Sequence, residues 1–249
     1  MDEKMDCPIC ASSCALLDVV DFNKSCEEAR GKFLKLSGRP VYYVRCSECG
    51  YCFCPEICSW SMPEFDRHIY NSDYISIDPD YVEARPTANA SILQSMFKDF
   101  PIHIKHLDYG GGNGLLSGLL KEKGWNSSTF DPYVTRNIAV DTIGRYDLIT
   151  AFEVFEHVPD PNALMDNISQ LVSDDGVILF STLVSDGHIS DNKRLDWWYA
   201  SPRNGHISLY TKNSLERLAN KCGFKFGSFS DGFHMMFRNS PPWAAHFFS

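Results

Sequence analysis

Beyond about residue 63, hydrophobic positions alternate between short apolar runs and segments with one apolar face. The runs predict strands at Ile102 to Tyr109, Ser127 to Phe130, Asp147 to Phe152, Val177 to Phe180, Phe224 to Phe229 and, as an antiparallel edge strand, Phe233 to Phe237. Helical spacing predicts one helix from Leu115 to Gly124, one that starts at Asp160-Pro161 and one that Asn213 and Glu216 cap. This alternation favours an α/β fold with a mostly parallel sheet between helices.

The first part of the chain has a different composition. Nine of the ten cysteines lie between Cys7 and Cys58, and no long helical period accompanies them. We therefore expect two domains: a small cysteine-rich module at residues 1–69 and the α/β domain at residues 70–249.

Charge and hydropathy limit the partners. The 249 residues carry a formal net charge of -9, with no basic cluster, so a nucleic acid or an anionic membrane would be repelled. The first residues, MDEKMD, are acidic where a signal peptide would be basic, and no apolar run reaches transmembrane length. We expect a cytoplasmic protein without a nucleic-acid or membrane partner.

A glycine loop between a strand and a helix is the first candidate binding feature. It reads DYGGGNG, from Asp108 to Gly114, and lacks the third glycine of a dinucleotide fingerprint. Asp131 follows 23 residues after Asp108, at the end of the next strand, where a carboxylate accepts hydrogen bonds from ribose hydroxyls. This combination favours a cofactor that has a ribose but no pyrophosphate.

Four segments in this order resemble the class I S-adenosylmethionine-dependent methyltransferases of the small-molecule type: LDYGGGNG, FDP at Phe130 to Pro132, YDLITAFEVFEHVPDP at Tyr146 to Pro161, and GVILFST at Gly176 to Thr182. The resemblance implies a Rossmann-like sheet of seven strands, the third near Ile138 to Val140, and S-adenosylmethionine as the cofactor. It implies that Gly110, Gly112 and Gly114 pass under the methionine portion, that Asp131 holds the ribose, and that Phe152 and Glu153 lie near the cofactor. Asp108 either contacts the cofactor or orients the loop.

Methyl transfer depends on alignment of the acceptor and on removal of its proton where the acceptor requires it. His157 and His206 are the candidate bases, because histidine titrates near neutrality; for His157 a hydrogen bond within its loop is the alternative. Likeness to methyltransferases that share a zinc module, including sugar C-methyltransferases, implies that Trp198, Tyr199, Arg203 and His206 line the acceptor pocket. Arg203 suits a carboxylate or a phosphate, and core packing is the alternative for the tryptophans.

Two residues before the first strand of the α/β domain are weaker candidates. Arg85 would pair with the carboxylate of the cofactor, and Tyr74 would cover the cofactor from a lid. A solvated arginine is the alternative.

Two C-x-x-C knuckles, Cys7 with Cys10 and Cys46 with Cys49, have the spacing of a structural four-thiolate zinc site. A redox disulfide would leave the second knuckle unexplained. Cys52, Cys54 and Cys58 would replace a ligand, hold a second metal or cluster, or be ordinary buried thiols.

The sequence therefore favours a zinc-containing methyltransferase that acts on a small polar metabolite, such as a sugar or another acceptor with a hydroxyl or carboxylate. A non-catalytic binding scaffold that retains the fold is the first alternative. An oxidoreductase is the second, and the missing third glycine disfavours it.

Overall fold

A computed structural model describes residues 5–97, 103–135 and 138–248. The chain divides into two compact units. Unit 1 comprises Met1–Pro79, Phe155–Asn162 and Leu183–Leu218, and unit 2 comprises Asp80–Val154, Ala163–Thr182 and Ala219–Ser249. Each unit is assembled from three segments of the chain, and the domain boundary expected near residue 70 stays a prediction.

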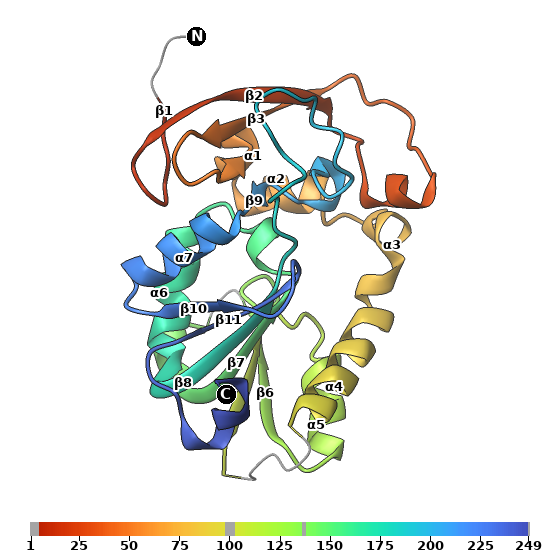
Figure 1. The fold of residues 1–249 in the computed structure, drawn as a ribbon. Coiled ribbons are helices and arrows are strands. Elements are labelled where there is room, and N and C mark those ends of the chain that lie inside the picture. Colours follow the sequence, from red (N-terminus) through yellow and green to blue (C-terminus); the bar gives the residue numbers. More distant parts are fainter. Residues whose placement is uncertain (1–4, 98–102, 136–137, 249) are drawn as a thin grey trace. The chain divides into compact units, whose positions relative to one another are not determined.

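Unit 2 is built on a mixed sheet in the order β10-β11-β8-β7-β5-β6 (Figure 1). Its strands are β5 (Lys105–Tyr109), β6 (Asn126–Phe130), β7 (Tyr146–Phe152), β8 (Val172–Ser181), β10 (Lys225–Ser228) and β11 (Phe233–Phe237). Strands β8, β7, β5 and β6 are parallel, whereas β11 is antiparallel to both of its neighbours. The α/β fold class is confirmed.

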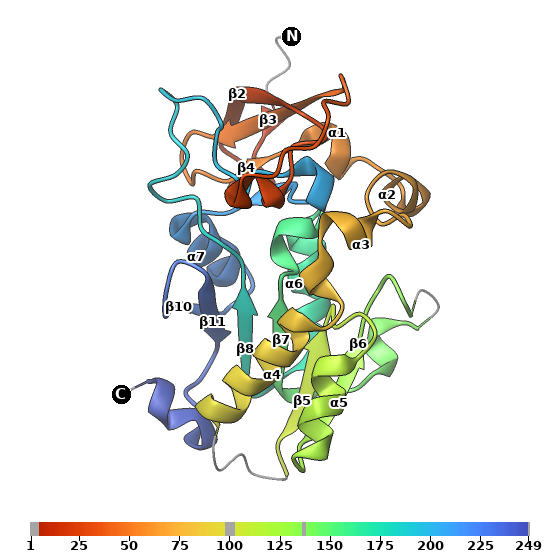
Figure 2. The ribbon, with the colours of Figure 1, turned by 90° about the vertical axis from the view of Figure 1, so that its right-hand side faces the viewer.

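Helices cover both faces of this sheet. Figures 1 and 2 show α4 (Ala84–Met96) beside α5 (Leu115–Glu122) on one face and α6 (Pro161–Leu171) on the other. Two short 3-10 helices, η3 (Val140–Thr142) and η6 (Pro242–Phe247), complete unit 2. The core joins residues of α4, α5 and the strands, among them Leu93, Leu120, Leu148 and Leu179. Burial of these leucines contributes about 1.5–3 kcal/mol for each side chain.

The sheet differs from the expected one at two places. Six strands rather than seven are present among the described residues, because Val140 begins a 3-10 helix where the third strand was expected. Strand β11 is an inner strand, and β10 takes the edge position beside it. Ile102, the first residue of the first expected strand, lies outside the described residues.

The starts of α6 and α7 (Lys212–Lys221) show how the local sequence sets a helix boundary. Asp160 caps α6 as expected, since its Oδ1 accepts the Asn162 N–H at 2.8 Å. For α7 the expected cap at Asn213 is wrong. Thr211 Oγ1 accepts the Ser214 N–H at 3.0 Å and Ser214 Oγ accepts the Thr211 N–H at 2.9 Å, which is a reciprocal capping pair.

Unit 1 contains a five-stranded antiparallel sheet in the order β1-β2-β3-β4-β9. Its strands are β1 (Met5–Asp6), β2 (Ser13–Asp21), β3 (Pro40–Cys46), β4 (Cys52–Phe53) and β9 (Ser208–Leu209). Its helices are η1 (Cys26–Arg30), α1 (Pro55–Cys58), α2 (Met62–His68), α3 (Tyr74–Ile77), η4 (Phe155–His157) and η5 (Pro202–Asn204), and η2 (Pro79–Tyr81) follows at the unit boundary. Large aromatic side chains fill its interior: Tyr51 lies 5.1 Å from Phe53 and 5.0 Å from Tyr210 between ring centroids.

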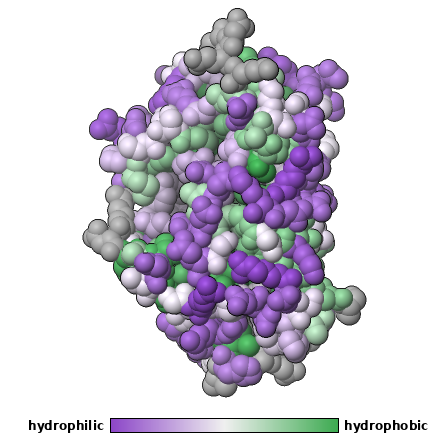
Figure 3. Space-filling model, turned by 90° about the vertical axis from the view of Figure 1, so that its left-hand side faces the viewer, coloured by the Kyte–Doolittle hydropathy of each residue, from purple (hydrophilic) through white to green (hydrophobic). Residues whose placement is uncertain are grey.

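The surface is mixed in polarity. On the face shown in Figure 3, hydrophilic residues are interspersed with small hydrophobic patches. Among the residues that the structure describes, no helix combines the length and the apolar character needed to cross a bilayer.

Buried polar side chains of the parallel sheet form a hydrogen-bond network. The Thr150 hydroxyl donates to Asp108 Oδ1 at 2.9 Å, and His106 Nε2 lies 3.0 Å from the same hydroxyl. Because the hydroxyl has one hydrogen and gives it to Asp108, His106 must donate from Nε2 and accept the Ser127 hydroxyl at Nδ1, at 2.7 Å. Burial lowers the pKa of His106 to about 3 and raises the pKa of Asp108 to about 7. The imidazole is therefore neutral in the folded protein.

We predict that the stability advantage of the wild type over His106→Gln shrinks as the pH falls below 6.5. The unfolded chain takes up a proton on this histidine near pH 6.5, whereas the folded chain does so only near pH 3. Between these values the wild type loses up to about 1.4 kcal/mol for each pH unit relative to the variant. Urea unfolding of both proteins at several pH values measures this difference.

Asp108 has the opposite linkage, because its folded-state pKa is raised, and the comparison cancels the part of its contribution that does not depend on His106. His103→Gln is the matched control, since His103 is exposed. If the free energy of unfolding changes with pH in the same way for wild type and H106Q, His106 has the same pKa in the folded and unfolded chain, and the prediction is wrong.

Candidate functional site

The carboxyl ends of β5 and β7 form the switch point of the parallel sheet in unit 2. Strand β6 pairs with β5 on one side and β7 pairs with β5 on the other, so the connections leave the sheet in opposite directions at this place. The glycine loop, Gly110 to Gly114, follows β5, and Glu153 follows β7. Ligands of open α/β sheets bind at such a crevice.

The glycine loop adopts a conformation that side chains disfavour. Gly110, Gly112 and Gly114 have φ values of 73°, 54° and 81°, in the left-handed region. A Cβ at Gly110 would lie 2.5 Å from Val154 Cγ2, and one at Gly111 would lie 2.2 Å from Asp108 Oδ2. A Cβ at Gly112 would meet no protein atom within 4 Å. The first two glycines thus allow internal packing, and Gly112 leaves the outer side of the loop open.

Asp131, which follows β6, holds this loop through hydrogen bonds to backbone N–H groups. Its Oδ2 accepts the Gly112 N–H at 2.9 Å, and its Oδ1 accepts the Tyr133 N–H at 2.8 Å. The Val134 N–H also donates to Oδ1, at 3.3 Å. A carboxylate has about four acceptor positions, so the three backbone bonds leave about one, on Oδ2, for a ligand hydroxyl. Asp108 is buried beneath the loop and accepts from Thr150, a contact that suits orientation of the loop.

The residues after β7 form a second anchored group in unit 2. Glu153 has a left-handed φ of 54°, and its N–H donates to Ser181 Oγ at 2.9 Å. The Ser181 hydroxyl donates in turn to Glu153 Oε1 at 2.9 Å, and Arg85 Nη1 lies 3.3 Å from Glu153 Oε2. Phe152, the last residue of β7, is half-buried and packs on Phe233 with 5.9 Å between centroids. Of the predicted cofactor contacts, only Tyr74 belongs to unit 1.

The two candidate bases lie together in unit 1. The rings of His157 and His206 are 4.8 Å apart between centroids, and His206 Nδ1 lies 2.9 Å from the Tyr199 carbonyl oxygen. The Tyr199 hydroxyl donates to Glu156 Oε1 at 2.5 Å, and the Tyr70 hydroxyl lies 3.3 Å from His157 Nδ1. Glu156 and His206 are buried, which makes this cluster unusual in its polarity.

Trp198 is exposed, whereas Arg203 and Tyr74, the other predicted ligand contacts of unit 1, bond to protein groups. Trp198 is 37% exposed. Arg203 is buried, and its guanidinium donates to the Ile69 carbonyl at 3.1 Å and to Asn71 Oδ1 at 3.4 Å. The Tyr74 hydroxyl donates to the Asn204 carbonyl at 3.2 Å. These bonds of Arg203 and Tyr74 tie together segments of unit 1.

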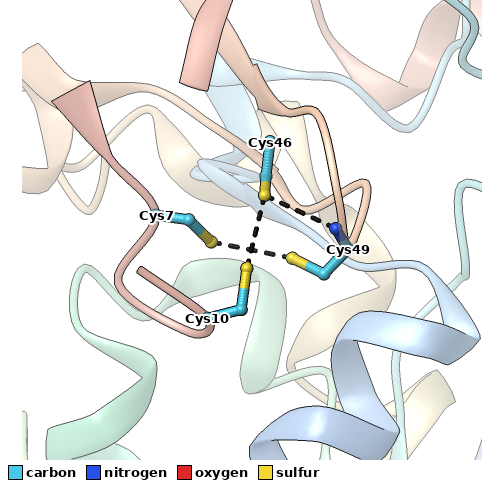
Figure 4. Close-up of side chains that lie close together, drawn as sticks. All are labelled: Cys7, Cys10, Cys46 and Cys49. Atoms are coloured by element: carbon cyan, nitrogen blue, oxygen red, sulfur yellow. Dashed lines mark hydrogen bonds between the residues drawn. The ribbon is translucent and has the colours of Figure 1, made fainter. Parts of the chain in front are cut away.

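Four cysteine sulfurs converge in unit 1 (Figure 4). Cys7 Sγ lies 3.6 Å from Cys49 Sγ, and Cys10 Sγ lies 3.4 Å from Cys46 Sγ. All four are free thiols, and Cys46 Sγ also accepts the Cys49 N–H at 3.4 Å. In a tetrahedral site with metal–sulfur bonds of about 2.3 Å, sulfurs lie about 3.8 Å apart. The four thiols therefore fit one tetrahedral ion.

Cys52, Cys54 and Cys58 are not members of this group of four. Cys52 and Cys54 are fully buried, and burial raises the pKa of both thiols. Burial also raises the pKa of Cys58 to about 12. Thiols with a raised pKa stay protonated, which suits the alternative of ordinary structural thiols for these three cysteines.

Glu156 is a member of the histidine cluster that the sequence alone does not single out. The only signal is its place in Val-Phe-Glu-His-Val, where a carboxylate stands in a run that is otherwise largely apolar. Tyr70 and Ser181 carry no local signal, because their contacts come from distant parts of the chain.

Comparison with known proteins relates the chain to methyltransferases. It is 32% identical over 102 residues to the ubiquinone biosynthesis O-methyltransferase of Cronobacter sakazakii, covering 32% of this chain and 42% of that protein. It is 30% identical over 106 residues to the enzyme of the same name from Salmonella paratyphi A, covering 33% and 44%. The chain therefore matches less than half of the length of these relatives.

Solved structures are also similar at low sequence identity. The Burkholderia thailandensis 1,6-didemethyltoxoflavin-N1-methyltransferase, solved with bound 1,6-didemethyltoxoflavin and S-adenosylhomocysteine, has a TM-score of 0.48 and 17% identity, covering 75% of this chain and 93% of that one. The pyocyanin biosynthetic protein PhzM has a TM-score of 0.49 and 13% identity, covering 71% and 61%.

The family model described as a methyltransferase domain matches residues 81–227, which is more than half of the chain. This stretch contains the glycine loop, Asp131 and Glu153. The chain belongs to the methyltransferase-domain family.

Proposed function

We propose that this protein transfers a methyl group from S-adenosylmethionine to a small polar acceptor that bears a hydroxyl or carboxylate, such as a sugar. The observation that carries the proposal is the bond between Asp131 and Gly112, which joins the end of β6 to the glycine loop at the switch point. Membership of the methyltransferase-domain family supports the chemistry.

The cofactor side of the reaction belongs to unit 2. The open side of Gly112 allows a ligand to approach the backbone. Asp131 keeps about one acceptor position, on Oδ2, for a ribose hydroxyl. Arg85 is held by Glu153. Because a guanidinium has five N–H donors, it can bind Glu153 and the carboxylate of the cofactor together. S-adenosylmethionine supplies the methyl group when it is bound.

The acceptor side belongs to unit 1 in this proposal. Trp198 contributes exposed aromatic surface, and the pair of His157 and His206 handles the proton of the acceptor. Tyr199 is only 2% exposed, and its contact with the acceptor stays a prediction. Contact of Arg203 with an acidic group and cover of the cofactor by Tyr74 stay predictions, because their described bonds are to protein groups. The chain passes from unit 2 into unit 1 between Val154 and Phe155, so Glu153 and His157 are close in sequence.

We propose zinc for the four-cysteine site. Four thiolates fill a tetrahedral coordination shell, which leaves no position for a substrate, so the ion stabilises the fold of unit 1. Convergence of the four sulfurs supports this role.

We predict that Asp131→Ala weakens S-adenosylmethionine binding by roughly 1–3 kcal/mol, a roughly 5- to 150-fold rise in Kd. The substitution removes the acceptor of a ribose hydroxyl and releases the Gly112 N–H. Isothermal titration calorimetry with S-adenosylmethionine measures the change, and Asp131→Asn, which keeps one acceptor oxygen, should have an intermediate Kd.

Asp174→Ala is the control, because the Asp174 side chain is 89% exposed and pairs with Arg145 at the surface of unit 2. An unchanged affinity in D131A would remove Asp131 from the site. Binding of NAD without binding of S-adenosylmethionine would support an oxidoreductase, and cofactor binding without methyl transfer to any acceptor would support a scaffold.

We predict one zinc ion per chain at the cysteine site, and its loss in Cys49→Ser. Removal of one thiolate breaks the four-sulfur set and lowers the stability of unit 1, because metal binding contributes to folding. Elemental analysis and thermal unfolding test both effects. Cys222→Ser is the control, since Cys222 belongs to unit 2; equal zinc loss in both variants would contradict the assignment.

A further inference from the structure

We propose that Glu156, His157 and His206 form a second metal site in unit 1, which binds a divalent cation with nitrogen and oxygen ligands. Its part in methyl transfer, as the place where an oxygen of the acceptor binds, rests on the proposed function. Binding of the cation itself does not.

The three side chains have the chemistry and the spacing of metal ligands. One ligand atom from each lies within 4.8 Å of the other two. Two imidazole nitrogens and one carboxylate oxygen are the donors of many divalent transition-metal sites. The segments that carry them are joined by a hydrogen bond from the Ile207 N–H to the Glu156 carbonyl at 2.9 Å. The backbone thus holds the donors together independently of an ion.

The hydrogen bond of His206 selects the nitrogen that would bind a metal. Nδ1 lies 2.9 Å from the carbonyl oxygen of Tyr199, and a carbonyl oxygen only accepts. Nδ1 therefore carries the hydrogen, and in the neutral imidazole the lone pair is on Nε2. Metal-bound histidines nearly always donate their other N–H to a carbonyl or carboxylate in this way.

The other two ligands have similar outer partners. The Tyr199 hydroxyl donates to Glu156 Oε1 at 2.5 Å, so Tyr199 orients two of the three ligands. The Tyr70 hydroxyl lies 3.3 Å from His157 Nδ1. Gly205 makes room for this contact, because a Cβ there would lie 3.0 Å from His157 Nδ1 and 3.2 Å from the Tyr70 hydroxyl.

Burial of Glu156 and His206 favours binding of a cation by the cluster. Glu156 is fully buried and His206 is 3% exposed. An ionised carboxylate in such a place is costly unless hydrogen bonds and a positive charge balance it. A divalent ion provides that charge and uses the imidazole lone pairs at the same time.

This site differs from the four-cysteine site in what it can do. Three protein ligands leave at least one coordination position open, whereas four thiolates leave none. An ion with an open position binds a hydroxyl oxygen of a second molecule and lowers the pKa of that hydroxyl. With the ion bound, this effect replaces direct proton removal by His157 and His206, because their lone pairs are used by the ion. The matching acceptor has an ionisable hydroxyl, or two adjacent oxygens that chelate the ion.

Zinc stoichiometry tests the proposal, because zinc binds nitrogen and oxygen ligands more tightly than most divalent ions. The full chain is loaded with zinc, exchanged into metal-free buffer and weighed by native mass spectrometry. We expect two ions in the wild type, one in Cys49→Ser, one in His206→Gln and one in Glu156→Gln. The C49S/H206Q double variant should hold none.

Matched variants separate loss of the site from loss of the fold. His188→Gln is the control for His206→Gln, because His188 is an exposed histidine of unit 1 and should leave two ions bound. Tyr199→Phe keeps all three ligands but removes the hydroxyl bond to Glu156, and should weaken the second zinc by roughly 10-fold or more. Y199F therefore tests the site even if E156Q does not fold.

One ion in the wild type and none in C49S would overturn the proposal, as would two ions in both wild type and H206Q. The zinc count is independent of the cofactor. If wild type holds two ions and fails to bind S-adenosylmethionine, the proposed function is wrong and the metal site stands.

Discussion

The loop after β5 depends on a backbone path that only glycine follows without strain. Gly110, Gly112 and Gly114 all have left-handed φ values, and the carboxylate of Asp108 lies where a Cβ of Gly111 would be. The conformation of the loop is therefore fixed by packing on Asp108 and by the hydrogen bond from Gly112 to Asp131. Because the protein fixes its shape, the loop presents its backbone to a ligand with little entropy left to lose.

Each unit buries a polar network, and the two networks are balanced in different ways. In unit 2, His106 is neutral and bonds to hydroxyl groups, and burial raises the pKa of Asp108 to about 7, so this network carries little charge. In unit 1, Glu156 and the two histidines bring an ionisable carboxyl group and two imidazoles to one point. Buried networks of the first type specify a fold, and those of the second type are found at functional sites.

Most of unit 2 could be predicted from the sequence, because local signals mark its elements. Asp160-Pro161 marks the start of α6, and Phe233 to Phe237 is a strand with the expected bounds. The third strand was expected from the family pattern, although the chain between Asp131 and Tyr146 is short, and it is not formed in the described part. The inner position of β11 depends on pairing with β8, which no local pattern encodes.

Only those parts of the candidate site that lie within a local sequence motif could be predicted. The glycine loop, Asp131 and the paired cysteine knuckles have fixed spacings, so the sequence identifies them. The histidine cluster depends on long-range contacts, since Tyr70, Glu156 and His206 come from three separate segments of unit 1. Side chains that meet in this way leave no period and no spacing to detect.

The pairing of β4 with β9 has a consequence for synthesis of the chain. Cys52 lies opposite Leu209, so the sheet of unit 1 gains its last strand only after more than 150 further residues have been made. During translation the nascent cysteine-rich segment has an open strand edge, which is a target for mispairing.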